Sequence, residues 1–267
     1  MTTDTQETTM TRTETAAALY FEVRGAGDPM LLIPGTPGDG GQFDALADVL
    51  ADHRTVITYD RAGASRSALA SAATVADHAD DAAGLLRARA TRPAVVYGTS
   101  NGAMVALELA LRHPSLVERV ILHEPPLLSV LADPAPVGAM LGEMIGSAMQ
   151  RGGPPAALDA FLRFAFGDDV VAGWPAELRE RMLANAESVF GVELPAFQAY
   201  RPDEQALADL SVPVTVAVGR DQGAPFFLEA AEWIAARAGA EVVRTPGAHG
   251  PQFTCPAELA RALLSTT

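Results

Sequence analysis

A serine lies at the centre of a short glycine-bounded motif near the middle of the chain. The motif reads GTSNG over residues 98–102, between the β-branched run AVVY at 94–97 and an apolar segment of helical period. A sharp strand-to-helix turn of this kind exposes the serine hydroxyl above the carboxyl edge of a sheet, and the flanking glycines avoid a collision with neighbouring backbone. Chance matches to the motif rarely have this context, so Ser100 is predicted to be a nucleophile.

A serine hydroxyl needs a base to take its proton, and the base needs a third group to orient it. Of the five histidines, only His249 follows the last predicted strand, in the loop TPGAHGP. That loop should lie at the carboxyl edge of the sheet, within reach of Ser100. His249 is therefore predicted to be the base.

Two carboxylates are candidates for the group that orients the base. Asp221 follows the predicted strand 213–218 in the turn GRD, between the serine and the histidine in chain order. Glu124, in LHEPP, ends the preceding strand and is the alternative acid, although it could equally be a polar residue at the hinge of the next segment. Asp221 is the preferred acid, since it places a carboxylate at the carboxyl end of a strand in the order serine, acid, histidine.

An oxyanion formed at the attacked carbonyl needs backbone donors close to the serine. The N–H of Asn101, the residue after the nucleophile, is one by its position. The second is expected from the glycine-rich loop PGTPGDGG at 34–41, where Thr36 is the predicted donor because Pro34 and Pro37 have no N–H group.

These motifs together resemble the α/β-hydrolase family over almost everything after residue 16. The similar segments are LLIPGTPG, YDRAGASRS, GTSNGA, VGRD and GAHG. The resemblance implies a lidded, esterase-like serine hydrolase, and a serine at position 100 differs from the family's aspartate-dependent haloalkane dehalogenases and epoxide hydrolases. The family's usual His-Gly is Pro34-Gly35 here, and Ser65 replaces a glycine, so no subfamily's substrate can be transferred.

The elements that must position these residues follow an alternating pattern. Short apolar runs bounded by Gly, Pro or Asp alternate with segments of helical period, which predicts an α/β fold with a mostly parallel central sheet and helices on both faces. The first two strands, 18–24 and 30–33, are expected to form an antiparallel pair at the sheet edge. The other strands are predicted at 55–59, 94–97, 119–122, 213–218 and 241–244.

The alternation stops between residues 126 and 210, where helices are broken by RGGPP, GDD and prolines. We predict a helical lid insertion at 126–210, a hydrolase core at 17–125 and 211–267, and a mobile N-terminal tail at 1–16. The insertion holds most of the large aromatic and methionine side chains, which could form a small helical core or line an apolar pocket. The pocket candidates are Phe164, Trp174, Met140 and Met144.

The bulk composition narrows the possible partners. A net charge of −14 would repel the phosphates of nucleic acid and an anionic membrane surface, so neither is an expected partner. Cys255 is the single cysteine, so it can form neither an internal disulfide nor a thiolate metal site. The polar, Thr-rich start has no apolar secretion signal, so a cytoplasmic protein is expected, as a monomer or homodimer. The frequent Ala and the use of Arg without Lys indicate a bacterial source. All nineteen basic residues are Arg, which rules out lysine-based chemistry.

The predicted reaction is acyl transfer to water at an ester, thioester or lactone of a hydrophobic small molecule, with no metal or organic cofactor. Two alternatives remain open. The same site could hydrolyse a carbon–carbon bond or carry out another biosynthetic tailoring reaction. The chain could also be an accessory protein that binds a ligand in the pocket with little turnover.

Overall fold

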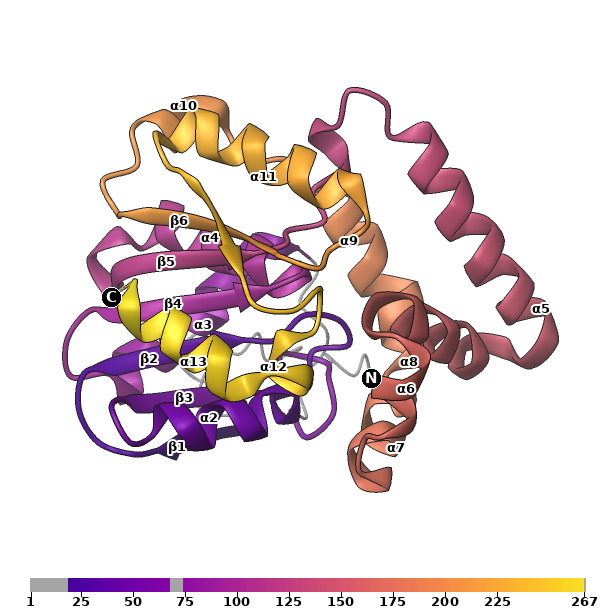
Figure 1. The fold of residues 1–267 in the computed structure, drawn as a ribbon, viewed down its shortest axis with the longest axis horizontal. Coiled ribbons are helices and arrows are strands. Elements are labelled where there is room, and N and C mark those ends of the chain that lie inside the picture. Colours follow the sequence, from indigo (N-terminus) through magenta and orange to yellow (C-terminus); the bar gives the residue numbers. More distant parts are fainter. Residues whose placement is uncertain (1–18, 68–73, 267) are drawn as a thin grey trace, which may run out of the picture.

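A seven-stranded sheet forms the centre of the computed structural model, which describes residues 19–67 and 74–266 (Figure 1). The tail predicted at 1–16 lies outside these residues. The strand order is β1-β3-β2-β4-β5-β6-β7. The strands are β1 (Phe21–Arg24), β2 (Pro29–Ile33), β3 (Thr55–Tyr59), β4 (Ala94–Thr99), β5 (Val117–His123), β6 (Val214–Gly219) and β7 (Val242–Thr245).

All seven predicted strands are present, but the expected pairing of the first two is wrong. β1 pairs antiparallel with β3, whereas β2 lies between β3 and β4 and is parallel to both. The reason is burial: every residue of β2 is buried, which suits an interior strand, while β1 is only partly buried at the edge. The prediction of a mostly parallel sheet is confirmed.

Helices cover both faces of the sheet, as the alternation of side chains requires. In β2, Leu31 belongs to the buried cluster on one face of the sheet, which also includes residues of α3 (Val75–Arg89), α4 (Asn101–Arg112) and α11 (Pro225–Ala238). Leu32 points to the other face and belongs to a second buried cluster, which includes residues of α2 (Asp44–Leu50) and α13 (Pro256–Ser265). Because β2 and its neighbours are apolar on both faces, the sheet is the core of the molecule.

A run of helices separates β5 from β6, and α5 to α9 gather beyond one end of the strands (Figure 1). This helical insertion has a small apolar core of its own, centred on Leu158, Leu162 and Met182. Its elements are η3 (Leu128–Val130), α5 (Ala135–Phe166), α6 (Asp168–Ala172), α7 (Ala176–Ala184), α8 (Ala186–Ser188), the π-helical turn η4 (Val189–Glu193), α9 (Leu194–Ala199) and α10 (Glu204–Ala208).

Two details of the insertion refine its prediction. The backbone of α5 leaves helical geometry at Gly152 and Gly153, directly before two prolines, so RGGPP breaks the helix as expected. α10 packs against α11 and belongs to the helical layer of the sheet.

The short elements elsewhere are η1 (Gly40–Phe43), η2 (Pro114–Leu116) and α12 (Pro251–Thr254). Within 19–67 and 74–266, no helix combines the length and apolarity needed to cross a membrane.

Candidate active site

Ser100 lies in a strained turn between β4 and α4. Its backbone has φ 54° and ψ −129°, a region that L-residues rarely adopt. A side chain on Gly98 would collide with the carbonyl of Gly102, and one on Gly102 would collide with the carbonyl of Ile33. The two glycines predicted to permit the turn are therefore required by close backbone packing on both sides of Ser100.

His249 is held by Glu124, not by Asp221. His249 Nδ1 and Glu124 Oε2 are 2.6 Å apart, and both side chains are buried. The N–H of Gly219 donates to Glu124 Oε1 at 2.8 Å, and the amide of Gln222 donates to Oε2 at 2.7 Å. The carboxylate is thus held by three polar partners at the ends of β6 and β7.

These partners determine the charge of Glu124. Burial by itself would raise the pKa of this carboxyl group. The hydrogen bond to His249, the imidazoles of His123 and His249 and the N–H of Gly219 outweigh burial and lower the pKa of Glu124 to about 2. Glu124 is therefore an anion at neutral pH, suited to orient an imidazole and to stabilise its protonated form.

The preference for Asp221 as the partner of His249 is wrong in this structure. After β6 the chain turns back onto β7, where Arg220 N–H donates to Thr245 and Asp221 N–H donates to Gly247. That turn leaves the Asp221 side chain exposed. Glu124 can take its place because β5 lies between β4 and β6, so the end of β5 is one strand closer to Ser100.

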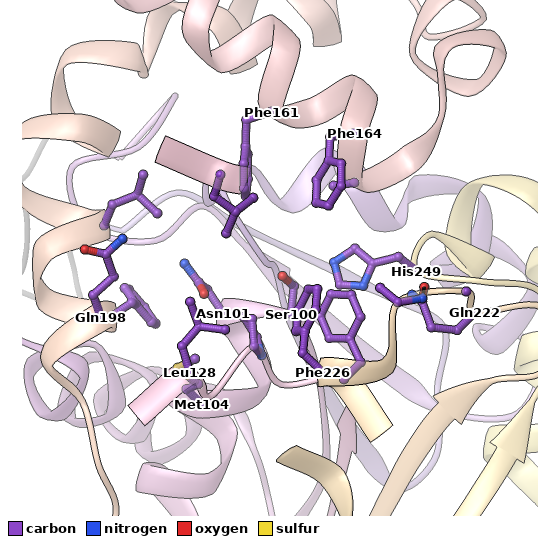
Figure 2. Close-up of a pocket in the computed structure, with 18 residues that line it drawn as sticks. Ser100, Asn101, Met104, Leu128, Phe161, Phe164, Gln198, Gln222, Phe226 and His249 are labelled. Atoms are coloured by element: carbon purple, nitrogen blue, oxygen red, sulfur yellow. Dashed lines mark hydrogen bonds between the residues drawn. The ribbon is translucent and has the colours of Figure 1, made fainter. Parts of the chain in front are cut away.

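Two aromatic rings hold the imidazole of His249 in place. Phe227 from α11 stacks on it with centroids 4.6 Å apart, and Phe166 at the end of α5 lies 5.8 Å away. With Nδ1 directed to Glu124, the other ring nitrogen is left for the cavity that His249 shares with Ser100 (Figure 2). The structure therefore brings the two predicted residues to one site.

Thr36 and Asn101, the predicted oxyanion donors, also lie together beside Ser100. A Cβ on Gly35 would be 2.9 Å from Ser100 Cβ, so the loop that carries Thr36 runs directly against the serine. The Asn101 side-chain amide donates to Thr36 Oγ1 at 2.8 Å. Asn101 begins α4, where the first N–H groups of a helix have no intrahelical partner.

A buried ion pair next to these residues was missed at the sequence level. Arg61 Nη2 donates to Glu193 Oε1 at 2.7 Å, and Thr36 Oγ1 donates to the same oxygen at 2.6 Å. Arg61 follows β3 and is 1% exposed, whereas Glu193 ends η4 in the insertion. The sequence does hold one signal for this ion pair, a single carboxylate within the apolar run SVFGVELPAF. A carboxylate in such a run indicates a buried charge, and a charge is buried at low cost only when it is paired.

A cavity of about 350 Å³ lies between the insertion and the sheet edge. Phe161 and Phe164 reach into it from α5, opposite Ser100 and His249 (Figure 2). Among the described residues that line it, none is Asp, Glu, Lys or Arg. The lining residues are Ser100, Asn101, Met104, Pro126, Leu128, Leu141, Phe161, Phe164, Ala165, Leu194, Phe197, Gln198, Gln222, Gly223, Ala224, Phe226, Phe227 and His249.

Of the four predicted pocket residues, only Phe164 lines this cavity. Trp174 instead packs against Phe253, with centroids 4.9 Å apart, and belongs to the core of the insertion. Met140 is 43% exposed, and Met144 is also outside the lining. Leu141 takes the expected place of Met140 because successive helical residues point in directions about 100° apart.

No cluster of three or more His, Cys, Asp or Glu side chains within 19–67 and 74–266 could hold a metal ion. The polar groups at the cavity are instead a hydroxyl, an imidazole and backbone or side-chain amides. Such a set can deprotonate a serine hydroxyl and stabilise negative charge on a carbonyl oxygen.

The chain shares sequence similarity with several curated proteins, among them two bacterial hydrolases. It is 45% identical to the uncharacterized hydrolase YraK of Bacillus subtilis over 118 residues, which are 43% of this chain and 44% of that protein. It is 38% identical to a putative carbamate hydrolase, RutD of Yersinia enterocolitica, over 109 residues, 39% of each chain. The matched segments span about two fifths of the length of these relatives.

The similarity to a solved structure extends over almost the whole chain. A thermophilic esterase from Thermogutta terrifontis superposes with a TM-score of 0.72 and 25% identity, covering 93% of this chain and 92% of that one. A sequence model of the alpha/beta hydrolase family matches residues 30–262. With this match and with the sheet, the insertion and the serine turn described above, the chain belongs to the alpha/beta hydrolase family.

Proposed function

We propose that the protein is a serine hydrolase that cleaves an ester or lactone of an uncharged, apolar small molecule through an acyl-enzyme. The observation that carries this proposal is the placement of Ser100, on a strained turn, in the same cavity as an imidazole whose Nδ1 is paired with Glu124. A serine, a histidine and a buried carboxylate in this relation are the parts of a nucleophilic triad.

In the proposed mechanism, Ser100 Oγ attacks the carbonyl carbon while His249 Nε2 takes the hydroxyl proton. The oxyanion that forms is held by the N–H groups of Thr36 and Asn101. Collapse of this intermediate breaks the bond to the alcohol, which leaves with the proton from His249. Water then attacks the acyl-enzyme by the same route and releases the acid, while Glu124 remains an anion throughout.

The lining of the cavity supports an uncharged, apolar substrate. Aromatic and aliphatic side chains surround the space between Ser100 and α5, while Gln198 and Gln222 add two amides. A charged substrate group would be desolvated there without an ionic partner, which is unfavourable. The insertion acts in this proposal as a lid whose α5 and α9 determine which apolar groups fit.

Covalent labelling with a fluorophosphonate probe tests the proposal directly. We expect stoichiometric modification at Ser100, and loss of both labelling and p-nitrophenyl butyrate hydrolysis in Ser100→Ala, by a factor of about 10³ or more. Ser265→Ala, an exposed serine at the end of α13, is the matched control and should behave as the wild type. A folded wild-type protein that resists the probe would indicate a ligand-binding protein instead of a hydrolase.

A further inference from the structure

One carboxylate oxygen of the insertion, Oε1 of Glu193, lies at the centre of a set of hydrogen bonds that includes the side chains of both predicted oxyanion donors. Glu193 Oε1 accepts from Thr36 Oγ1 at 2.6 Å and from Arg61 Nη2 at 2.7 Å, and the Asn101 amide lies 3.5 Å away. The Asn101 amide also donates to Thr36 Oγ1 at 2.8 Å. The hydrogen bonds therefore form a chain with one direction, from Asn101 to Thr36 to Glu193.

The position of this chain relative to the nucleophile gives it a consequence for catalysis. Thr36 and Asn101 are the two residues on either side of Ser100 whose backbone N–H groups would hold an oxyanion. Their side chains are tied to each other and to Glu193, so the spacing of their backbones is fixed from the insertion. Small displacements of such donors have large effects on rate, because the donors must already be in place when charge develops.

Arg61 anchors the carboxylate and the loop at the same time. Its Nε donates to Pro34 O at 3.1 Å, two residues before Thr36, and its guanidinium lies 5.3 Å from the centroid of the Phe197 ring on α9. The charges of Arg61 and Glu193 compensate each other, so the carboxylate can lie near a developing oxyanion without strong repulsion. The pair thus joins β3, the oxyanion loop and the insertion.

We propose that Glu193 is a positioning residue of the oxyanion hole, so that the insertion completes the catalytic site as well as covering the pocket. This inference rests on the proposed function. Glu193 touches no reacting atom; it acts through the Thr36 hydroxyl and the Asn101 amide. With η4 packed in place, the backbone N–H groups of Thr36 and Asn101 are held at the spacing that an oxyanion requires. Without the Glu193 contact, the distance between these two N–H groups is no longer fixed.

The test uses variants that break the chain without leaving an unpaired buried charge. Thr36→Val removes the hydroxyl but keeps the backbone N–H, and the double variant Arg61→Met with Glu193→Leu removes both charges together. Thr36→Ser restores the hydroxyl, and Glu187→Gln removes an exposed carboxylate of the insertion as a matched control. Fluorophosphonate titration counts active sites, so that a partly unfolded sample does not mimic a slow enzyme.

For p-nitrophenyl butyrate we expect kcat to fall by about tenfold to hundredfold in Thr36→Val and in the double variant, with KM changed by no more than about twofold. The Ki of 2-phenylethylboronic acid, whose tetrahedral serine adduct places an oxygen in the hole, should rise by the same factor. Combining all three substitutions should be no worse than the double variant, because they interrupt one chain. Thr36→Ser should recover most of the loss.

Three results would overturn the inference: kcat within about twofold of the wild type in active-site-titrated variants, an unchanged boronic acid Ki despite a lower kcat, or multiplicative losses in the triple variant. The wild type serves to separate this inference from the proposed function. If it reacts with neither the fluorophosphonate nor the boronic acid, the hydrolase proposal itself fails, and the role of Glu193 fails with it. If it reacts with both and the variants are unaffected, only the role of Glu193 is rejected.

Discussion

Glu124 reaches His249 from a backbone conformation that few side chains adopt. Its φ is 48°, and its own N–H donates to Ala217 of β6. The turn directs the carboxylate across the end of β6, where Gly219 and Gln222 donate to it.

The identity of the acid can be tested by two amide substitutions. Glu124→Gln should lower kcat on an activated ester by about 10³- to 10⁴-fold, since an amide favours the wrong imidazole tautomer. Asp221→Asn should change kcat by less than about twofold, because that exposed side chain contributes little to positioning. The measurement is steady-state hydrolysis of p-nitrophenyl butyrate. A stronger effect of Asp221→Asn than of Glu124→Gln would identify Asp221, after β6, as the acid.

The sequence predicts the nucleophile and the base better than the acid. Ser100 and His249 depend on local rules: two glycines beside a strand end, and a loop after the last strand. The choice between Glu124 and Asp221 depends on how far each side chain reaches and on the turn after β6, which places Asp221 in solvent. Those are properties of three-dimensional packing, and both residues satisfy the same chain order.

At the level of elements, the insertion divides its apolar side chains between two tasks. Phe161 and Phe164 of α5 line the cavity, whereas Leu158 and Leu162 of the same helix pack in the core of the insertion, which Phe161 also contacts at its edge. The two sets of side chains point in different directions from the axis of α5. Both hypotheses for this segment, a small helical core and a pocket lining, therefore apply to different faces of α5.

Paired alanine substitutions should separate these tasks. Phe164→Ala, at a side chain 41% exposed, should change the ratio of kcat/KM for p-nitrophenyl hexanoate to that for the acetate by about tenfold, with little change in Tm. Trp174→Ala should leave the ratio unchanged and destabilise the insertion by about 3–5 kcal/mol, as large buried aromatic deletions do. Esterase assays and thermal melts measure both. Equal losses on both esters in Phe164→Ala would assign it to folding.

The element pattern was readable from sequence where local signals were strong. RGGPP marks the break in α5, and short runs rich in apolar residues mark all seven strands. The position of β2 inside the sheet was not readable, because the turn-forming GAGDP is equally compatible with a hairpin. The prediction of Met140 as a pocket residue is wrong because composition identifies an apolar helix but not the rotation of that helix.

The whole molecule is expected to be sensitive to acid, because its buried ionisable groups favour neutral pH. Burial, only partly opposed by Glu124, lowers the pKa of His123 to about 4. Burial and the adjacent Arg61 likewise lower the pKa of His78 well below its usual value. The unfolded chain binds protons at these imidazoles below a pH of about 6.5, while the folded chain does not, so stability falls as the pH drops towards 4.

Glu124 adds a second loss at lower pH. Its folded pKa is about 2, below the ordinary value of 4.5, so its stabilising contribution is complete above pH 4.5 and disappears as the pH falls through 2. Two acid-sensitive ranges are therefore expected, one from the histidines and one from the carboxylate. The first lies closer to neutrality.

Thermal melts between pH 7.5 and pH 4.5 test the histidine range. The Tm of the wild type should fall by roughly 5 °C or more over this interval. His123→Phe, which keeps a ring but removes the ionisation, should show a smaller fall. His53→Gln, at an exposed histidine, is the control and should follow the wild type. An equal fall in His123→Phe would show that His123 is not among the groups responsible.

The two positive-φ residues of the site, Ser100 and Glu124, lie at the ends of neighbouring strands, joined through the hydrogen bond from Ser100 N–H to the His123 carbonyl. Glycine would adopt the conformation of Ser100 without penalty, so serine carries a backbone cost at position 100, whereas the contacts of the Glu124 carboxylate offset the cost at position 124. Activity and stability compete here within a few residues. Selection for heat resistance alone would therefore favour glycine at position 100 and so remove the proposed nucleophile, and stabilising designs should exclude Ser100 and Glu124 from change.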